Sequence, residues 1–90
     1  MVIGANILVS GVVQGVGFRY YVWEQAMHLR LKGFVKNNHD GTVEIEVEGT
    51  RFLIDEFLKR LKIGSRSSKV TDIKVKWKDH KNQFKTFDIR

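Results

Sequence analysis

Two segments of the chain alternate strictly between apolar and polar residues. From Thr42 to Glu48 three apolar residues alternate with three glutamates, and from Val70 to Lys78 apolar residues alternate with three lysines. Such alternation is typical of a strand that buries one face and exposes the other. The segment from Ala5 to Val12 is rich in apolar, β-branched residues and lies between glycines. We therefore expect three strands, and an exposed sheet face that carries the glutamates and the lysines.

Two further segments place their apolar residues at helical spacing, which predicts one helix over residues 18–31 and another that ends near Lys62. Thr50 precedes the second segment, in a position that suits a helix cap. The predicted buried faces consist of Phe18, Val22, Ala26 and Leu29 in the first helix and of Ile54, Phe57, Leu58 and Leu61 in the second.

Shorter stretches complete the pattern of elements. Residues 33–36 begin another strand, and residues 37–41 are polar and end in Asp-Gly, a strong signal for a hairpin turn. Residues 84–89 predict a short final strand with Phe87 and Ile89 on one face.

The predicted order is βαββαβ with a short terminal strand. Right-handed crossovers place both helices on the same face of an antiparallel sheet, which predicts an α+β, ferredoxin-like α/β sandwich. The length of 90 residues fits one domain over residues 1–90. This fold supports many unrelated functions, so the fold alone does not predict an activity.

Composition narrows the class of protein. Hydrophobic residues make up 42% of the chain and charged residues 29%, which is typical of a globular domain. The chain has no cysteine, and its three histidines, His28, His39 and His80, have no ligand-like spacing. We therefore expect no disulfide and no metal site.

Nothing in the sequence predicts a membrane segment or a targeting peptide. No stretch approaches the roughly 20 apolar residues that span a bilayer, and the N-terminus lacks the pattern of a signal peptide. The sequence therefore predicts a cytoplasmic protein with no membrane partner. No long apolar surface helix demands a partner chain, so a monomer is expected.

The net charge of +6 is unevenly spread. Residues 1–50 contain four basic and five acidic residues, whereas residues 51–90 contain twelve basic and five acidic residues. A positive field attracts small anions, and it attracts nucleic acid non-specifically. Scattered lysines are also common on solvated surfaces, so the charge by itself selects no partner.

The segment from Ser10 to Arg19 carries the most specific signal. It runs from the first strand into a loop with glycines at positions 11, 15 and 17, and then into the first helix. Glycines let several amides converge on one point, and a helix N-terminus adds its own unpaired amides, so the segment suits a small anion. Arg19 adds a planar set of donors for phosphate or carboxylate oxygens. The loop matches neither the dinucleotide-binding nor the P-loop pattern, and an ordinary strand-to-helix turn fits the glycines as well.

Two motifs resemble those of the acylphosphatase family. Residues 12–19 (VVQGVGFR) are similar to the family's V-Q-G-V-x-F-R signature. Residues 33–44 (GFVKNNHDGTVE) resemble its second signature, G-[WF]-V-[KR]-N-x-x-D-G-x-V-E. The motifs occur in the family's order, about 20 residues apart, and the resemblance covers nearly the whole chain.

The resemblance implies hydrolysis of the carboxyl–phosphate bond of small acyl phosphates without a metal or organic cofactor. It assigns two catalytic residues: Arg19, which holds the phosphoryl group, and Asn37, which orients the attacking water. It also assigns phosphate binding to the backbone amides of the loop that consists of Gln14, Gly15, Val16, Gly17 and Phe18.

Several details of this resemblance remain open from the sequence. By composition Asn38 is as good a candidate as Asn37, and both suit a turn; only the family register selects Asn37. The chain has Leu-Arg-Leu around Arg30 where the family often has Leu-Gly-Leu, and Gly-Ser-Arg ending at Arg66 where it often has Gly-Pro. Arg30 bears on the end of the helix, and Arg66 on access to the site or its charge.

Two other functions fit parts of the sequence. A ferredoxin-like domain with a positive charge also suits RNA binding, but RNA-recognition domains present aromatic residues where this chain predicts Glu44, Glu46 and Glu48. An accessory anion-binding module would retain the same motifs without the hydrolytic activity. We therefore expect no specific nucleic-acid partner and a small acyl phosphate as the ligand.

Overall fold

A computed structural model describes all residues from Met1 to Arg90. Its elements are β1 (Val2–Val12), α1 (Phe18–His28), β2 (Lys32–Asn37), β3 (Val43–Thr50), α2 (Arg51–Ile63), β4 (Lys69–Lys78) and β5 (Phe87–Ile89). The predicted βαββαβ order with a short terminal strand is confirmed.

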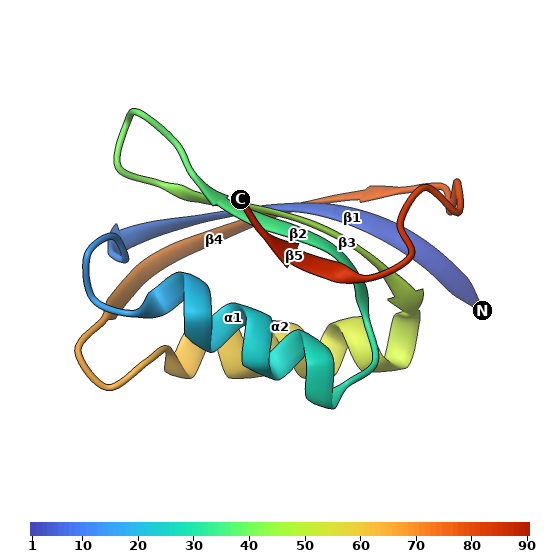
Figure 1. The fold of residues 1–90 in the computed structure, drawn as a ribbon, viewed down its shortest axis with the longest axis horizontal. Helices are drawn as coiled ribbons and strands as arrows, with labels where there is room; N and C mark the ends of the chain where they lie inside the picture. Colours follow the sequence, from blue (N-terminus) through green and yellow to red (C-terminus); the bar gives the residue numbers. More distant parts are fainter.

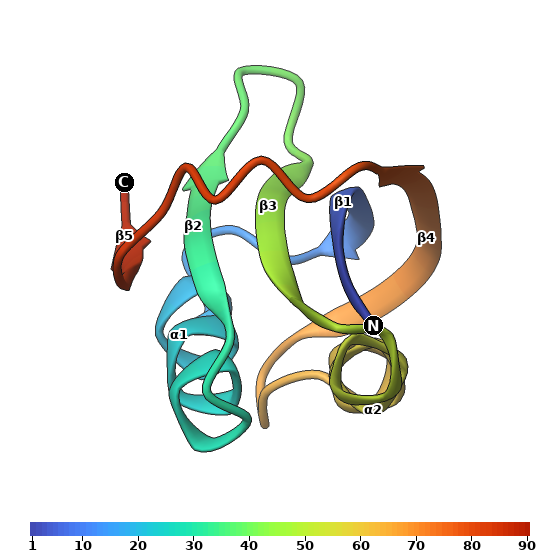
Figure 2. The same ribbon diagram turned by 90° about the vertical axis from the view of Figure 1, so that its right-hand side faces the viewer.

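The strands form one sheet in the order β4-β1-β3-β2-β5, and both helices cover the same face of it (Figures 1 and 2). The two central strands, β1 and β3, pair along most of their length, from Val2 opposite Thr50 to Val9 opposite Val43. The other face of the sheet carries no helix. The predicted two-layer, ferredoxin-like α/β sandwich is therefore confirmed.

The core lies between the sheet and the helices, where 17 buried apolar residues form one cluster. The alternation in β3 explains which of its residues belong to the core: Val43, Ile45 and Val47 face the helices, while the glutamates between them face away. The predicted helix residues Phe18, Val22, Ala26, Leu29, Ile54, Phe57 and Leu61 are all buried, and Leu58 is half-buried.

The predictions for the C-terminal segment need two corrections. The sheet is mixed rather than antiparallel throughout, because β5 pairs parallel with β2. The final strand covers only Phe87–Ile89, whereas residues 84–86 lie outside it. Because β4 and β5 lie at opposite edges of the sheet, the connecting residues 79–86 cross its open face, as Figure 2 shows. This path leaves only three residues to pair along the edge of β2.

The carboxylate of Glu48 holds this crossing segment in place. Glu48 is 6% exposed, and its Oε2 and Oε1 accept hydrogen bonds from the amides of Lys81 (3.1 Å) and Gln83 (3.2 Å). His80 Nδ1 lies 3.6 Å from Glu48 Oε2. A buried carboxylate is thereby satisfied by main-chain donors, as buried polar groups generally must be.

The first helix ends three residues before the predicted boundary, in a turn closed by Arg30. Leu31 N donates to Ala26 O (2.9 Å), and Arg30 N donates to Met27 O (3.1 Å), the pattern of a Schellman motif. Arg30 has a φ of 56°, in the left-handed region that glycine adopts most readily. The motif uses an exposed arginine where a glycine is the usual residue.

The start of the second helix departs from its predicted capping. Thr50 is the N-cap residue, but its hydroxyl makes no capping hydrogen bond. The carbonyl of Met1 instead accepts a hydrogen bond from Arg51 N (3.0 Å). The first amide of the helix is thus bonded by a residue remote in sequence, and the Thr50 side chain caps none of the others.

Candidate active site

A pocket of about 230 Å³ lies where β1 leads into α1, beside the ends of β2 and β5. Its lining consists of Val13, Gly15, Gly17, Phe18, Arg19, Tyr20, Asn37 and Ile89. Arg19 is the only charged residue in this lining, so an anion that enters meets no side-chain carboxylate there.

The loop before α1 leaves its amides unpaired. None of the amides of residues 14–17 donates a hydrogen bond within the chain, and the first bond of the helix runs from Tyr21 N to Gly17 O (3.1 Å). The first turn of a helix leaves its own amides without partners as well. Gly15 and Gly17 have φ angles of 73° and 75°, which turn the backbone into the helix without strain only because they lack a Cβ. The loop can therefore present several donors to one anion.

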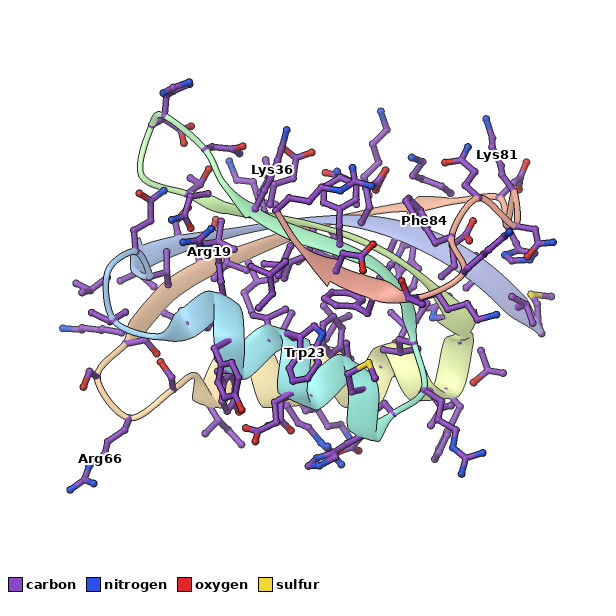
Figure 3. The ribbon with its side chains drawn as sticks, viewed as in Figure 1. Arg19, Trp23, Lys36, Arg66, Lys81 and Phe84 are labelled. Carbon is purple, nitrogen blue, oxygen red and sulfur yellow. The ribbon has the colours of Figure 1, made fainter.

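Arg19 lies in the first turn of α1, and its side chain rises toward the sheet (Figure 3). Its Nη1 donates to the main-chain oxygen of Arg90 at 2.9 Å. A guanidinium has five N–H donors, so this bond orients the group and leaves the others for a ligand. The position beside the positive end of the helix is costly for a cation without an anion between them.

Asn37 is the last residue of β2 and is half-buried. Its Oδ1 atom is buried and has no hydrogen-bond partner. It is an acceptor beside a polar pocket, which a water molecule that donates to it would satisfy.

The structure distinguishes Asn37 from Asn38, which composition does not. Asn38 Nδ2 donates to Thr42 Oγ1 (3.1 Å), and Asn38 N donates to Thr42 O (2.9 Å). Both bonds serve the hairpin turn, and Asn38 does not line the pocket. Asn37 lines the pocket with an unpaired oxygen.

Gln14 joins the glycine loop to the hairpin. Its Nε2 donates to both Asn38 O (2.8 Å) and Thr42 O (2.9 Å). The side chain thus fixes the loop relative to the strand end that carries Asn37.

The carboxylate of Asp40 closes the tip of the hairpin. Its Oδ1 accepts bonds from Thr42 Oγ1 (2.7 Å) and Thr42 N (3.0 Å). The hydrogen bond from the Thr42 side chain, followed by that from its backbone, lowers the pKa of Asp40 below its usual value.

Of the predicted site residues, Gly15, Gly17, Phe18, Arg19 and Asn37 line one pocket, whereas Gln14 and Val16 do not. Sequence reasoning missed Val13, Tyr20 and Ile89 as lining residues. The sequence offered a signal for two of them, since Val13 lies directly before the glycine loop and Tyr20 directly after Arg19. Ile89 had none, because only the pairing of β5 with β2 brings it to the pocket.

The loop that carries Arg66 contacts the glycine loop but adds no charge to the pocket. Ser65 Oγ donates to Val16 O at 3.3 Å. Arg66 is exposed, and its side chain points away from Arg19 (Figure 3).

Neither α-helix is long and apolar enough to cross a bilayer.

Comparisons with known proteins agree on one family. The acylphosphatase family model matches residues 5–89. An acylphosphatase from Bacillus licheniformis is 48% identical over 84 residues, which cover 93% of each chain. The crystal structure of acylphosphatase from Bacillus subtilis matches with a TM-score of 0.95 and 43% identity, over 100% of this chain and 99% of that one. A structure of full-length HypF, in a phosphate- and nucleotide-bound form, matches with a TM-score of 0.91 and 35% identity, over all of this chain and 12% of its own. The resemblance seen in the two sequence motifs is confirmed, and the chain belongs to the acylphosphatase family.

Proposed function

We propose that this protein hydrolyses small acyl phosphates to a carboxylate and inorganic phosphate. The observation that carries the proposal is that one pocket combines a guanidinium, unpaired backbone amides and an unpaired amide oxygen. Membership of the acylphosphatase family supports it independently. Residues 1–90 act in this proposal as one domain.

The phosphoryl group binds between Arg19 and the glycine loop. The free N–H groups of Arg19 and the amides from Gln14 to Phe18 donate to its oxygens, with those of Gly15, Gly17 and Phe18 nearest the pocket. Phosphoryl transfer needs mainly positioning and stabilisation of charge on these oxygens. Donors that are already oriented supply both without reorganisation during the reaction.

The attacking water is held by Asn37. One O–H of the water donates to Asn37 Oδ1, which leaves an oxygen lone pair to attack phosphorus. As the new P–O bond forms, the bond between phosphorus and the acyl oxygen breaks, and the carboxylate leaves with the electron pair. A carboxylate is a good leaving group and needs no general acid.

The second proton of the water goes to a phosphate oxygen of the substrate. No carboxylate or imidazole lines the pocket, so the chain supplies no general base at this position. The lining also lacks the carboxylate, imidazole and thiol ligands that hold metal ions in proteins, and the proposed reaction uses no metal or other cofactor.

The open face of the sheet argues against the RNA-binding alternative. Its aromatic residue on β2, Phe34, is covered by the edge of Phe84 (centroids 5.9 Å apart) and by the Arg90 guanidinium, 4.1 Å from its centroid. The β3 glutamates on this face repel phosphates, and Lys78 is paired with Glu46. The proposal therefore includes no nucleic-acid partner. It places the enzyme in the cytoplasm as a monomer.

The decisive experiment measures hydrolysis of benzoyl phosphate by the wild-type protein and by Arg19→Ala, with and without EDTA. We expect turnover that EDTA does not change and a loss of at least about 10³-fold in Arg19→Ala, because a charged anchor is removed. Arg66→Ala is the matched control, since it removes an arginine that points away from the pocket. Wild-type turnover in Arg19→Ala would refute the assigned site, and no turnover in the wild type would favour an accessory anion-binding module.

A further inference from the structure

The pocket is larger than the phosphate group that the proposed function places in it. Its volume is about 230 Å³. The groups assigned to the phosphate, Arg19 and the amides of Gly15, Gly17 and Phe18, form only part of the lining. The rest of the lining is left for the acyl part of the substrate.

The remaining lining is apolar and reaches the surface. Val13 is 1% exposed and forms part of the floor, whereas Tyr20 and Ile89 are 59% and 44% exposed and form the rim. Ile89 pairs with Val35, so its side chain lies on the helix-facing side of the sheet, the same side as that of Asn37 two residues later. Tyr20 comes from α1. The rim therefore lies between α1 and the edge of the sheet.

The ring of Tyr20 is held in place by a neighbouring aromatic ring. It packs against Trp23, with ring centroids 5.7 Å apart and planes inclined by 33°. Trp23 Nε1 in turn donates to Phe87 O at 3.1 Å, which ties this aromatic pair to β5 (Figure 3). A ring that already packs against a neighbour loses less conformational freedom when a ligand contacts it.

The rim is also tied to the phosphate-binding groups. Tyr20 follows Arg19 in the chain, and Ile89 precedes Arg90, whose main-chain oxygen accepts the hydrogen bond from Arg19 Nη1. Both rim residues line the same pocket as Arg19. A substrate whose phosphate lies against Arg19 therefore has Tyr20 and Ile89 available for its acyl group.

We propose that Tyr20 and Ile89 form the acyl subsite of the enzyme and that they select acyl phosphates with an aromatic or branched apolar acyl group. This inference rests on the proposed hydrolytic function. The two residues are specificity-determining: an aromatic acyl group contacts both side chains and excludes water from them, whereas an acetyl or carbamoyl group is too small or too polar to do so.

The test compares kcat/KM for benzoyl phosphate and acetyl phosphate in the wild type, Tyr20→Ala, Ile89→Ala and Tyr20→Phe. The ratio of the two values removes effects on the common phosphate site. We expect Tyr20→Ala to lower the ratio by roughly 3- to 10-fold, mainly through KM, and Ile89→Ala to lower it by about 2- to 5-fold. Tyr20→Phe keeps the ring and should retain the wild-type ratio.

Two further measurements separate this inference from its alternatives. The inhibition constant of inorganic phosphate should be unchanged in Tyr20→Ala, because the proposed phosphate contacts come from Arg19 and the glycine loop and not from Tyr20. Met27→Ala is the matched control, since Met27 is an exposed apolar residue of α1 (48% exposed) that does not line the pocket.

The outcomes are distinct. A wild type that hydrolyses neither substrate overturns the proposed function itself. Active Tyr20→Ala and Ile89→Ala variants with a wild-type ratio overturn only the acyl subsite. Circular dichroism and the thermal midpoint establish that each variant is folded. Tyr20 and Ile89 are both partly exposed, and one folded variant of the two suffices for the test.

Discussion

Two loops of this protein differ in whether the chain itself supplies acceptors for their backbone amides. In residues 79–86, two amides donate to the carboxylate of Glu48, which is 6% exposed. In residues 14–17, no amide donates to any group of the chain. The amides of the first loop have acceptors within the chain, whereas those of the second loop have none and bind the phosphoryl group in the proposed function.

The difference separates a structural role from the proposed catalytic one. Unpaired polar groups lower stability, so they persist where a ligand uses them. Asn37 follows the same rule, since its buried Oδ1 has no partner, whereas the amide of its neighbour Asn38 is bonded within the hairpin. Changes on the two sides of this comparison should therefore affect activity and stability in opposite ways.

After Arg19→Ala, the largest effect is expected for Asn37→Ala. Loss of the group that holds the water should lower kcat for benzoyl phosphate by about 10²- to 10³-fold. The free energy of unfolding should not fall beyond the small loss of packing, because the variant also removes an unsatisfied buried oxygen. Asn38→Ala, measured in the same assay, should lose no more than a few-fold. Equal losses in the two variants would contradict the assignment.

Glu48→Ala should show the reverse. Two hydrogen bonds to a buried carboxylate disappear, which should lower the free energy of unfolding by about 2 kcal/mol and the thermal midpoint by roughly 8–16 °C. No atom of Glu48 lines the pocket, so kcat below the transition should stay within a few-fold. Glu48→Gln, which keeps one acceptor oxygen, should lie between. Lost activity at unchanged stability would show that the two loops are not independent.

Gly17→Ala tests the backbone of the open loop. The φ of Gly17 is 75°, and an added Cβ meets no atom within 4 Å, so the conformation rather than space opposes the substitution. We expect a loss of about 1 kcal/mol in stability, measured by urea unfolding, together with weaker inhibition by inorganic phosphate. Gly17→Asn should recover much of the stability, because asparagine tolerates this region. A more stable Gly17→Ala protein would contradict the expected strain.

Arg30→Gly extends the comparison to the two ends of α1. Its N-terminus is open, whereas its C-terminus is closed around Arg30 at a φ of 56°. Glycine adopts this conformation without the penalty of a Cβ, so the variant should be more stable by about 0.5–1 kcal/mol, a rise of roughly 2–8 °C. Arg30→Ala controls for the lost charge and should bring no such gain. Activity should be unchanged, since Arg30 does not line the pocket.

The smallest effect concerns Asp40, a second case, after Glu48, in which a carboxylate of the chain accepts hydrogen bonds from the backbone. Hydrogen bonds from Thr42 lower its pKa in the folded state, so its contribution to stability is present above the unfolded pKa of about 3.9 and is lost as the pH falls through the folded pKa. An NMR titration should give an Asp40 midpoint below 3.8, with the Thr42 amide shifting at the same pH. A midpoint at or above this value would contradict the hydrogen bonds of the hairpin tip. In Asp40→Asn the Thr42 shift in this range should disappear.

Much of the fold followed from local patterns. Strict alternation predicted which faces of β3 and β4 are exposed, because side chains of a strand alternate between its faces. Helical spacing predicted the buried residues of both helices, because residues three and four positions apart lie on the same face of a helix. The helix boundaries were harder to predict. The helix α1 ends at His28 because the Schellman turn at Arg30 closes it, and an arginine is not a usual sequence signal for such a turn.

The candidate site was predictable only in part. The glycine loop, Arg19 and the hairpin are each visible in the sequence, but the choice of Asn37 over Asn38 depended on a family register. The structure adds a physical reason, since only Asn37 lines the pocket with an unpaired oxygen. The bonds from Gln14 to the hairpin span 24 and 28 residues, and no local pattern predicts such contacts.

The sequence by itself determined the order of the elements, their buried faces and the presence of a loop suited to an anion, because each depends on residues close together in the chain. The tertiary structure alone decided that β5 runs parallel to β2, that Arg90 accepts a hydrogen bond from Arg19, and that Ile89 and Tyr20 line the same pocket. These features join segments some 50 to 70 residues apart. They result from how the whole chain packs over one sheet, with the crossing segment held by Glu48. Contacts between such distant segments cannot be predicted from the pattern of any short stretch of sequence.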